Sequence, residues 1–214
     1  ITPQGAKNEA LQVLCAVLLT KEPVTLQNVP DIADVNALIE VLQDMGVSIS
    51  RPEPNTIILQ ADNIDPEYFN TATFRKKSGK LRGTVMLAGP MLARFRTPYI
   101  PQPGGDKIGR RRLDTHILGF EKLGVTCTYD SENQLFSMQA DKLTGAHMLL
   151  EEPSVTGTAN MVMAAVLAEG TTTIYNAACE PYVQQLCHML NSMGAHISGI
   201  SSNLLTIEGV SGLK

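Results

Sequence analysis

The stretch of this sequence best suited to binding an anion is a short, basic, glycine-rich segment. Residues 103–112 carry three glycines, four cationic side chains and one carboxylate, Asp106. Glycines let a loop approach a ligand closely, and arginine can bind phosphate with two parallel hydrogen bonds. The segment therefore indicates a loop that contacts a phosphorylated ligand. A solvated basic turn is the alternative.

Polar, glycine-containing segments also precede three strongly apolar stretches. They hold Lys7 after Gly5, Arg82 before Gly83, and the run from Ser154 to Thr158. The free N–H groups and the dipole at a helix start favour anions. If the fold brings these three helix starts to one end, they form an anion site. Lone basic residues at helix starts can also be ordinary solvated surface.

One pattern of elements recurs three times along the chain and predicts the frame for these residues. Each copy has an apolar helix, a strand, an amphipathic helix and a pair of short strands, and no bounds are given for the single strand of the second copy. The apolar helices are expected at 11–19, 84–94 and 159–168, and the amphipathic ones at 34–45, 113–123 and 182–193. The single strands are expected at 24–29 and 172–175, and the pairs at 47–50 with 56–60, 125–129 with 134–138, and 195–198 with 204–207.

Each amphipathic helix is expected to stop at a glycine, namely Gly46, Gly124 or Gly194. Glycine adopts the left-handed conformation of a helix C-cap at low cost. The apolar helices must be surrounded by protein, so we predict an α/β domain with helices inside and sheets outside, in pseudo-threefold repeats at about 5–62, 80–143 and 152–210. Pro90 should kink its helix. Chance alternation of helices and strands is the alternative to a repeat.

Composition narrows the class of protein. The chain has 214 residues, is 43% hydrophobic and 18% charged, and carries a net charge of −4, which gives no reason to expect a nucleic-acid partner. No apolar run reaches the length of a membrane span. The four cysteines lack metal-ligand spacing and are expected to be reduced, buried thiols of a cytoplasmic protein. Because the chain lacks an initiator Met and opens on Ile1, we expect a fragment of a longer protein.

Four segments, which span most of the chain in order, resemble the UDP-N-acetylglucosamine 1-carboxyvinyltransferases of the EPSP synthase-like superfamily. They are GAKN (5–8), LAGPMLARF (87–95), PGGDKIGRR (103–111) and LAEGTTTIYNAACEP (167–181). The resemblance implies transfer of the enolpyruvyl group of phosphoenolpyruvate to the 3-hydroxyl of UDP-N-acetylglucosamine, the first committed step of peptidoglycan synthesis. It also implies three βαβαββ units, and that residues 1–214 form a single domain inserted into a second domain absent from this chain.

The resemblance assigns roles residue by residue. Phosphoenolpyruvate would be bound by Lys7, Asn8 and Arg111, and UDP-N-acetylglucosamine by Arg82, Arg111, Asp114, Ser154 and Val155. No metal or organic cofactor is expected, because phosphoenolpyruvate already carries its leaving group. The sequence departs from the commoner family pattern at Arg112, where proline is frequent, and at Glu152 and Pro153, so contacts there are in doubt.

Asp106 is the expected catalytic acid, and it stands where most family members have cysteine. The reaction delivers a proton to C3 of phosphoenolpyruvate, which a carboxylic acid can do if a closed loop raises its pKa, although nearby cations oppose that rise. A carboxylate cannot form the thioether that cysteine forms with fosfomycin, so resistance to that drug is expected.

Two other functions fit the same residues. One is a transferase of the 5-enolpyruvylshikimate-3-phosphate synthase type, which shares the fold and the donor but carries different motifs around its lysine and arginines. The other is a non-catalytic module that binds an anion or nucleotide. Under either reading we expect the isolated domain to show little or no turnover. A soluble α/β domain of unrelated role remains as the least specific reading.

Overall fold

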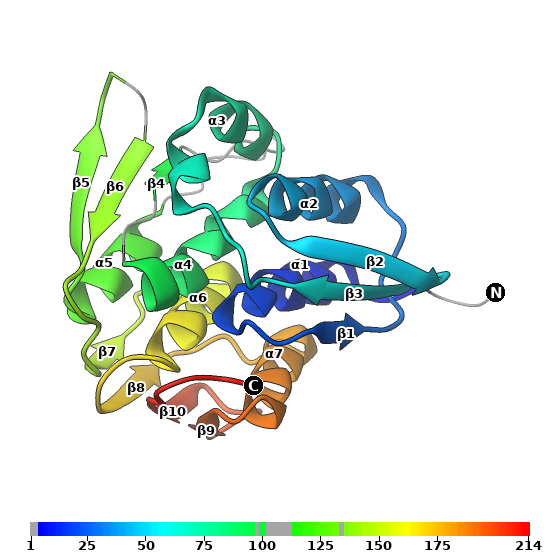
Figure 1. Cartoon of the computed structure of the whole chain (residues 1–214). Helices are drawn as coiled ribbons and strands as arrows, with labels where there is room; N and C mark the ends of the chain where they lie inside the picture. Colours follow the sequence, from blue (N-terminus) through cyan, green and yellow to red (C-terminus); the bar gives the residue numbers. More distant parts are fainter. Residues whose placement is uncertain (1–3, 97–98, 102–112, 133–134) are drawn as a thin grey trace.

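The computed structural model of the chain describes residues 4–96, 99–101, 113–132 and 135–214. Helices occupy the middle of the molecule, with the strands around them (Figure 1). The first unit contains α1 (Lys7–Ala16), the 3-10 turn η1 (Val17–Leu19), β1 (Val24–Leu26), α2 (Ala33–Asp44), β2 (Ser48–Glu53) and β3 (Thr56–Gln60). The second contains the 3-10 helix η3 (Arg82–Leu87), α4 (Ala88–Phe95), β4 (Tyr99–Pro101), α5 (Asp114–Lys122), β5 (Thr126–Asp130) and β6 (Leu135–Gln139). The third contains β7 (His147–Leu149), α6 (Val155–Ala165), β8 (Thr171–Tyr175), α7 (Pro181–Ser192), β9 (His196–Ser198) and β10 (Leu204–Glu208).

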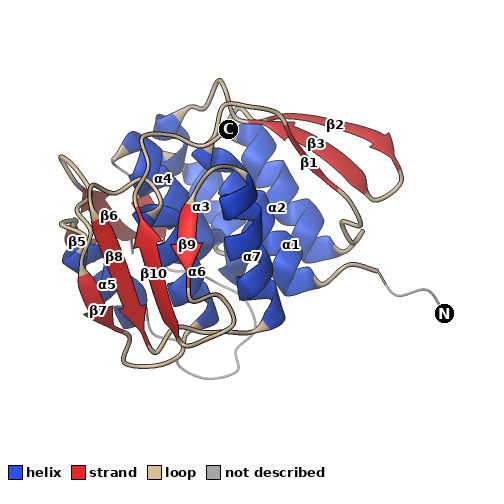
Figure 2. Cartoon of the chain, turned by 90° about the horizontal axis from the view of Figure 1, so that it is seen from below, coloured by secondary structure: helices blue, strands red, loops and turns tan. Residues whose placement is uncertain are grey.

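The three sheets share one strand order. They run β1-β3-β2, β4-β6-β5 and β8-β10-β9, so the last strand of each unit lies in the middle. All of these pairs are antiparallel, and β7 adds a parallel strand beside β8. The helices lie between the first sheet and the other two (Figure 2). The predicted α/β domain with helices inside is confirmed, whereas the bounds of the repeats and an axis relating them stay predictions.

Three helices, α1, α4 and α6, form the centre of the core. Every residue of α6 from Gly157 to Ala165 is buried, as is every residue of α4 from Ala88 to Ala93. These two helices approach closely at Gly89, where an added Cβ would lie 2.5 Å from the backbone oxygen of Asn160. The apolar character of these segments on all sides thus reflects helices enclosed by protein.

The predicted glycine stops are confirmed. Gly46, Gly124 and Gly194 have φ of +101°, +90° and +102°, in the left-handed region. In each case the N–H of the following residue donates to a carbonyl five positions back, and all three N···O distances are 3.0 Å. This is the Schellman arrangement, in which glycine satisfies carbonyls that the helix end would otherwise leave unpaired.

Several local features differ from the predictions. Pro90 does not kink a continuous helix, because it lies in the first turn of α4, where its missing N–H is not needed, directly after η3. The 3-10 turn η2 (Pro66–Asn70), α3 (Ala72–Ser78) and the bounds of β7 were not predicted, and β4 is the strand for which the second copy of the pattern gave no bounds. The cysteines are not uniformly buried: Cys15 and Cys187 are, but Cys179 is exposed. Within the described residues, no helix has the length and apolar character needed to cross a membrane.

Candidate functional site

The starts of three central helices meet at one pocket of about 310 Å³. Lys7 and Asn8 from α1, Arg82 from η3 and Val155 from α6 all line it. The three segments therefore lie at one end of the fold, which is the condition for an anion site drawn from the sequence. The other lining residues are Leu11, Gln12, Asp34, Lys80, Leu81, Gly83, Met86, Thr156 and Tyr182.

The backbone at two of these helix starts presents hydrogen-bond donors. α1 follows Ala6, whose side chain cannot cap it. α6 follows Ser154, whose Oγ accepts from the N–H of Gly157 at 3.1 Å. The N–H groups of Val155 and Thr156, in the same first turn, have no acceptor within the helix. An anion in the pocket would meet these donors and the positive ends of the helix dipoles.

The charges around the pocket are mostly positive. Among the described residues that line it, the cations are Lys7, Lys80 and Arg82 and the one acidic residue is Asp34, in a chain whose net charge is −4. Lys7 Nζ forms an ion pair with Asp34 Oδ2, and the two side chains are 50% and 42% exposed. An exposed pair of this kind contributes little to stability. A phosphate or carboxylate ligand can therefore compete for the Lys7 ammonium at small cost.

A buried polar network supports one wall of the pocket. Asn160, fully buried in α6, accepts from the N–H of Gly89 at 2.8 Å and donates to the carbonyl of Val85 at 2.9 Å. Its amide nitrogen also lies 2.8 Å from Nδ1 of His116 in α5. Nδ1 is then an acceptor, so Nε2–H of His116 donates to Thr156 Oγ1 at 3.1 Å. Thr156 keeps its own hydroxyl hydrogen for another acceptor.

His116 is held neutral in this network. Burial, with a smaller contribution from the Arg82 charge, lowers the pKa of its imidazole to about 4. A neutral ring has one N–H and one lone pair, which matches the two hydrogen bonds observed. His116 is therefore a structural link from α5 to Thr156 rather than a proton donor near neutral pH.

Two of the remaining predicted site residues are described and are absent from the pocket lining. Ser154 caps α6, and Asp114 begins α5; neither lines the pocket. Asp106 and Arg111 lie outside the described residues. The sequence did not point to Asp34, Gln12 or Tyr182, whose place in the site depends on which elements pack together.

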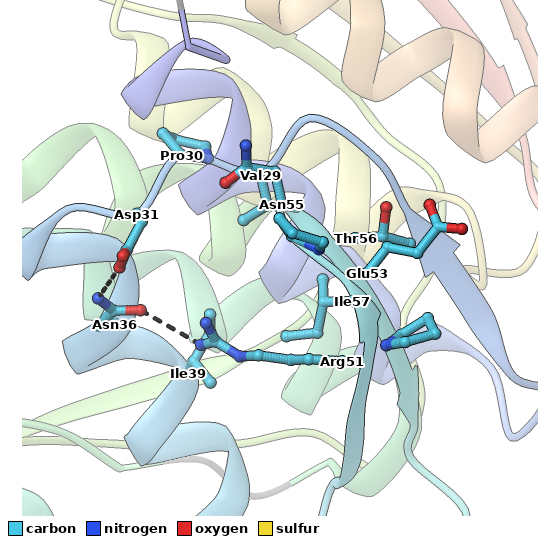
Figure 3. Close-up of a pocket in the computed structure, with 12 residues that line it drawn as sticks. Val29, Pro30, Asp31, Asn36, Ile39, Arg51, Glu53, Asn55, Thr56 and Ile57 are labelled. Atoms are coloured by element: carbon cyan, nitrogen blue, oxygen red, sulfur yellow. Dashed lines mark hydrogen bonds between the residues drawn. The ribbon is translucent and has the colours of Figure 1, made fainter.

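A second pocket, of about 370 Å³, lies between α2 and the first sheet (Figure 3). Its polar groups are bonded to one another: Asn36 donates to Asp31 at 2.7 Å and accepts from Arg51 at 3.3 Å. Within the described part of the chain, Arg51 is the single cation that lines this pocket, and the carboxylates of Asp31 and Glu53 accompany it. This pocket therefore lacks the positive charge that an anionic substrate needs.

The fold and the pocket define a class: an α/β domain with central helices, in which helix starts converge on a pocket lined mainly by positive charges. A family model described as EPSP synthase (3-phosphoshikimate 1-carboxyvinyltransferase) matches residues 1–214. The chain belongs to this family.

The chain is also similar to curated proteins that share one enzyme name. The chain is 59% identical over 213 residues to the UDP-N-acetylglucosamine 1-carboxyvinyltransferase of Porphyromonas gingivalis, which covers all of this chain and 49% of the relative. It is 60% identical over 210 residues to the enzyme of the same name from Bacteroides thetaiotaomicron, and 48% identical over 209 residues to that of Treponema pallidum. These matches cover 98% of this chain and 48% of each relative. The chain thus spans about half the length of these relatives.

Solved structures confirm the fold. The enolpyruvyl transferase NikO from Streptomyces tendae matches 97% of this chain and 47% of its own chain with a TM-score of 0.81, at 18% identity. EPSP synthase from Acinetobacter baumannii matches all of this chain and 47% of its own with a TM-score of 0.71, at 17% identity. At these identities the likeness concerns fold alone.

Proposed function

We propose that the chain is one domain of a UDP-N-acetylglucosamine 1-carboxyvinyltransferase that acts in peptidoglycan synthesis. The observation that carries the proposal is the pocket in which Lys7, Asn8, Arg82 and Val155 meet from three separate helix starts. Relatives of that name, 47–60% identical over nearly the whole chain, support the sugar nucleotide as acceptor. A second domain of the full-length protein would complete the site, since the chain spans about half of each relative.

In the proposed reaction the sugar 3-hydroxyl gives its proton to a general base as its oxygen attacks C2 of phosphoenolpyruvate, while an acid delivers a proton to C3. The resulting tetrahedral adduct then loses a proton from C3 and the C2–O bond to phosphate, which leaves the enol ether on the sugar. Each anionic group that takes part in these reaction steps is stabilised by cations and N–H donors whose positions stay fixed while negative charge moves between atoms. The described pocket offers Lys7, Arg82 and the first turn of α6 for that purpose.

We assign Lys7 and Asn8 to phosphoenolpyruvate, and Arg82 with the backbone of Val155 to the sugar nucleotide. Asp34 holds the Lys7 ammonium at the pocket until an anion replaces it, which places the cation before the ligand arrives. Ser154, which caps α6, and Asp114, at the start of α5, are further proposed contacts to UDP-N-acetylglucosamine. Asp106 as proton donor and Arg111 as anion ligand are further proposals on residues outside the described ranges.

The proposal also concerns where the enzyme acts and how it responds to fosfomycin. We place the enzyme in the cytoplasm, because its proposed substrates are intracellular metabolites. The full-length protein should also resist fosfomycin, because Asp106 offers no thiolate for the drug to alkylate. Incubating the protein with fosfomycin and assaying residual activity over time tests the second point; progressive covalent inactivation would contradict it.

The acceptor assay tests the proposal. Phosphate release from phosphoenolpyruvate by the full-length protein is measured with UDP-N-acetylglucosamine, with shikimate-3-phosphate, or with neither. We expect phosphate release only in the reaction that contains UDP-N-acetylglucosamine. Release with shikimate-3-phosphate would favour the other branch of the family. Binding of the nucleotide without any release would favour the non-catalytic module.

A further inference from the structure

The hydrogen bonds of the buried network beside the pocket have a fixed direction. The amide oxygen of Asn160 accepts from the backbone N–H of Gly89 at 2.8 Å. The amide nitrogen of Asn160 is therefore the atom at its other two contacts, the carbonyl of Val85 at 2.9 Å and Nδ1 of His116 at 2.8 Å. An amide NH₂ group has two hydrogens, one for each contact. Nδ1 of His116 is thus an acceptor and carries no hydrogen.

This direction is passed on to the hydroxyl of Thr156. A neutral imidazole whose Nδ1 is an acceptor carries its hydrogen on Nε2, and Nε2–H of His116 donates to Thr156 Oγ1 at 3.1 Å. A hydroxyl that accepts at one contact keeps its own hydrogen for another. Within the described residues this hydroxyl makes no second hydrogen bond. Thr156 is therefore a donor that still lacks an acceptor, at the end of a chain that begins at the backbone of α4.

Thr156 is also the end of the chain that reaches the pocket. Thr156 lines the pocket and is partly exposed, whereas His116 is 3% exposed and does not line it. Thr156 lies in the first turn of α6, beside Val155, and the N–H groups of both residues have no acceptor within the helix. Arg82, which also lines the pocket, lies close enough to His116 for its charge to lower the pKa of the imidazole. A hydroxyl, two backbone donors and a cation therefore gather at this wall.

These groups match one kind of ligand atom. The hydroxyl and the two N–H groups can all donate, and Arg82 adds positive charge, so the wall suits a charged acceptor such as a phosphate oxygen. The direction of the network decides this match. If Thr156 donated to His116 instead, its oxygen would offer a ligand only lone pairs, which would repel a phosphate.

We propose that the side chain of Thr156 binds a phosphate group of the sugar nucleotide: its Oγ1–H donates to a phosphate oxygen, and His116 is a positioning residue that keeps this hydrogen available to the ligand. The inference rests on the proposed function, because it adds a side chain to the contacts assigned there to Arg82 and Val155. The nucleotide is the chosen ligand because those two residues are its neighbours at this wall, whereas Lys7 and Asn8 belong to α1.

Two substitutions of Thr156 in the full-length protein provide the test. Thr156→Val keeps the shape of the side chain and removes the hydroxyl, and Thr156→Ser keeps the hydroxyl. The Kd of UDP-N-acetylglucosamine is measured by calorimetry, and the KM of phosphoenolpyruvate at saturating nucleotide. We expect Thr156→Val to weaken the nucleotide at least about tenfold, because a hydrogen bond to a charged group is lost, and Thr156→Ser to stay within about threefold of the wild type. The KM of phosphoenolpyruvate should stay within about twofold in both variants.

Thr171→Val is the matched control, since Thr171 is exposed at the start of β8 and does not line the pocket. Its Kd should equal that of the wild type. Thermal unfolding without ligand separates binding from folding, because valine also leaves His116 Nε2–H without its acceptor. A Thr156→Val variant that unfolds at a lower temperature but keeps the wild-type Kd would show that Thr156 only anchors α5, and would overturn the inference.

Two other results would also overturn it. One is an equal loss of nucleotide affinity in Thr156→Val and Thr156→Ser, because serine retains the hydroxyl. The other is a raised KM for phosphoenolpyruvate with an unchanged nucleotide Kd, because the hydroxyl would then serve the other substrate. A wild type that neither binds UDP-N-acetylglucosamine nor releases phosphate in its presence would instead overturn the proposed function itself.

Discussion

Replacing Asn160 with leucine should destabilise the fold more than any other single change in the polar network beneath the pocket. Asn160 is 0% exposed and joins three elements: it accepts from Gly89 N–H in α4, donates to the carbonyl of Val85 in η3, and donates to His116 in α5. Leucine has the same branching and the same number of side-chain heavy atoms, so it leaves no cavity, and the loss of the hydrogen bonds is the main effect.

The size of the effect follows from the partners left behind. Gly89 lies in the first turn of α4, where its N–H has no acceptor within the helix, so Asn160 serves as its cap from a neighbouring helix. A buried donor or acceptor left unpaired costs roughly 1–3 kcal/mol. The carbonyl of Val85 keeps the N–H of Ala88 as a donor, so two groups, Gly89 N–H and His116 Nδ1, are left unpaired. We therefore expect a loss of about 2–6 kcal/mol, a large share of the roughly 5–15 kcal/mol that stabilises an ordinary domain.

Urea denaturation of the chain, followed by circular dichroism, measures this loss as a change in the free energy of unfolding. Asn191→Leu is the matched control. The Asn191 amide accepts a hydrogen bond from the N–H of Ile197 at 2.8 Å and donates one to its carbonyl at 2.9 Å. These bonds are only partly buried, so water can take the place of the lost amide. We expect about 1 kcal/mol there. If Asn160→Leu costs no more than Asn191→Leu, the network does not hold the helices together as described.

Two further predictions concern the same region. Gly89→Ala should destabilise by at least about 2 kcal/mol, because its Cβ would lie 2.5 Å from the backbone oxygen of Asn160; Gly194→Ala, with open space but a φ of +102°, should cost about 1–2 kcal/mol. Thermal unfolding of both variants checks the order, and the reverse order would contradict the packing argument. The pKa of His116 is lowered from the ordinary 6.5 to about 4 in the folded state. Between these pH values the unfolded state therefore binds more protons than the folded state. The free energy of unfolding should fall as the pH falls from 6.5 toward 4. Unfolding free energies at pH 7 and pH 4.5 should therefore differ by about 2–3 kcal/mol less in His116→Gln than in the wild type; an equal pH dependence in both would refute this.

Sequence reasoning succeeded where the signal is local. Apolar periodicity located α1, α2 and α7, and glycines at 46, 124 and 194 marked helix ends because the left-handed conformation is a property of the residue itself. The segment with η2 and α3 was missed although Asp65 and Thr71 are typical capping residues, bonded here to Glu67 and Phe74. Their helices are short, and short segments give little periodicity.

The candidate site was predictable in part for the same reason. Lys7, Arg82 and Val155 stand at corresponding points of the repeated pattern, so their meeting could be expected before the structure was known. Other features of the site depend on how helices pack against one another. These are the ion pair between Lys7 and Asp34 and the place of Gln12 in the pocket lining. No property of those residue types reveals such contacts in advance.

The central claim is that this pocket binds the reacting anions of an enolpyruvyl transferase. Its most direct test is phosphate release from phosphoenolpyruvate by the full-length protein, with and without UDP-N-acetylglucosamine, for the wild type, Lys7→Gln and Lys142→Gln. Lys142 is the control, since it pairs with Glu169 on the surface and does not line the pocket. We predict nucleotide-dependent release by the wild type and Lys142→Gln, and a loss of at least about a hundredfold in Lys7→Gln. Equal activity of the two lysine variants would contradict the account.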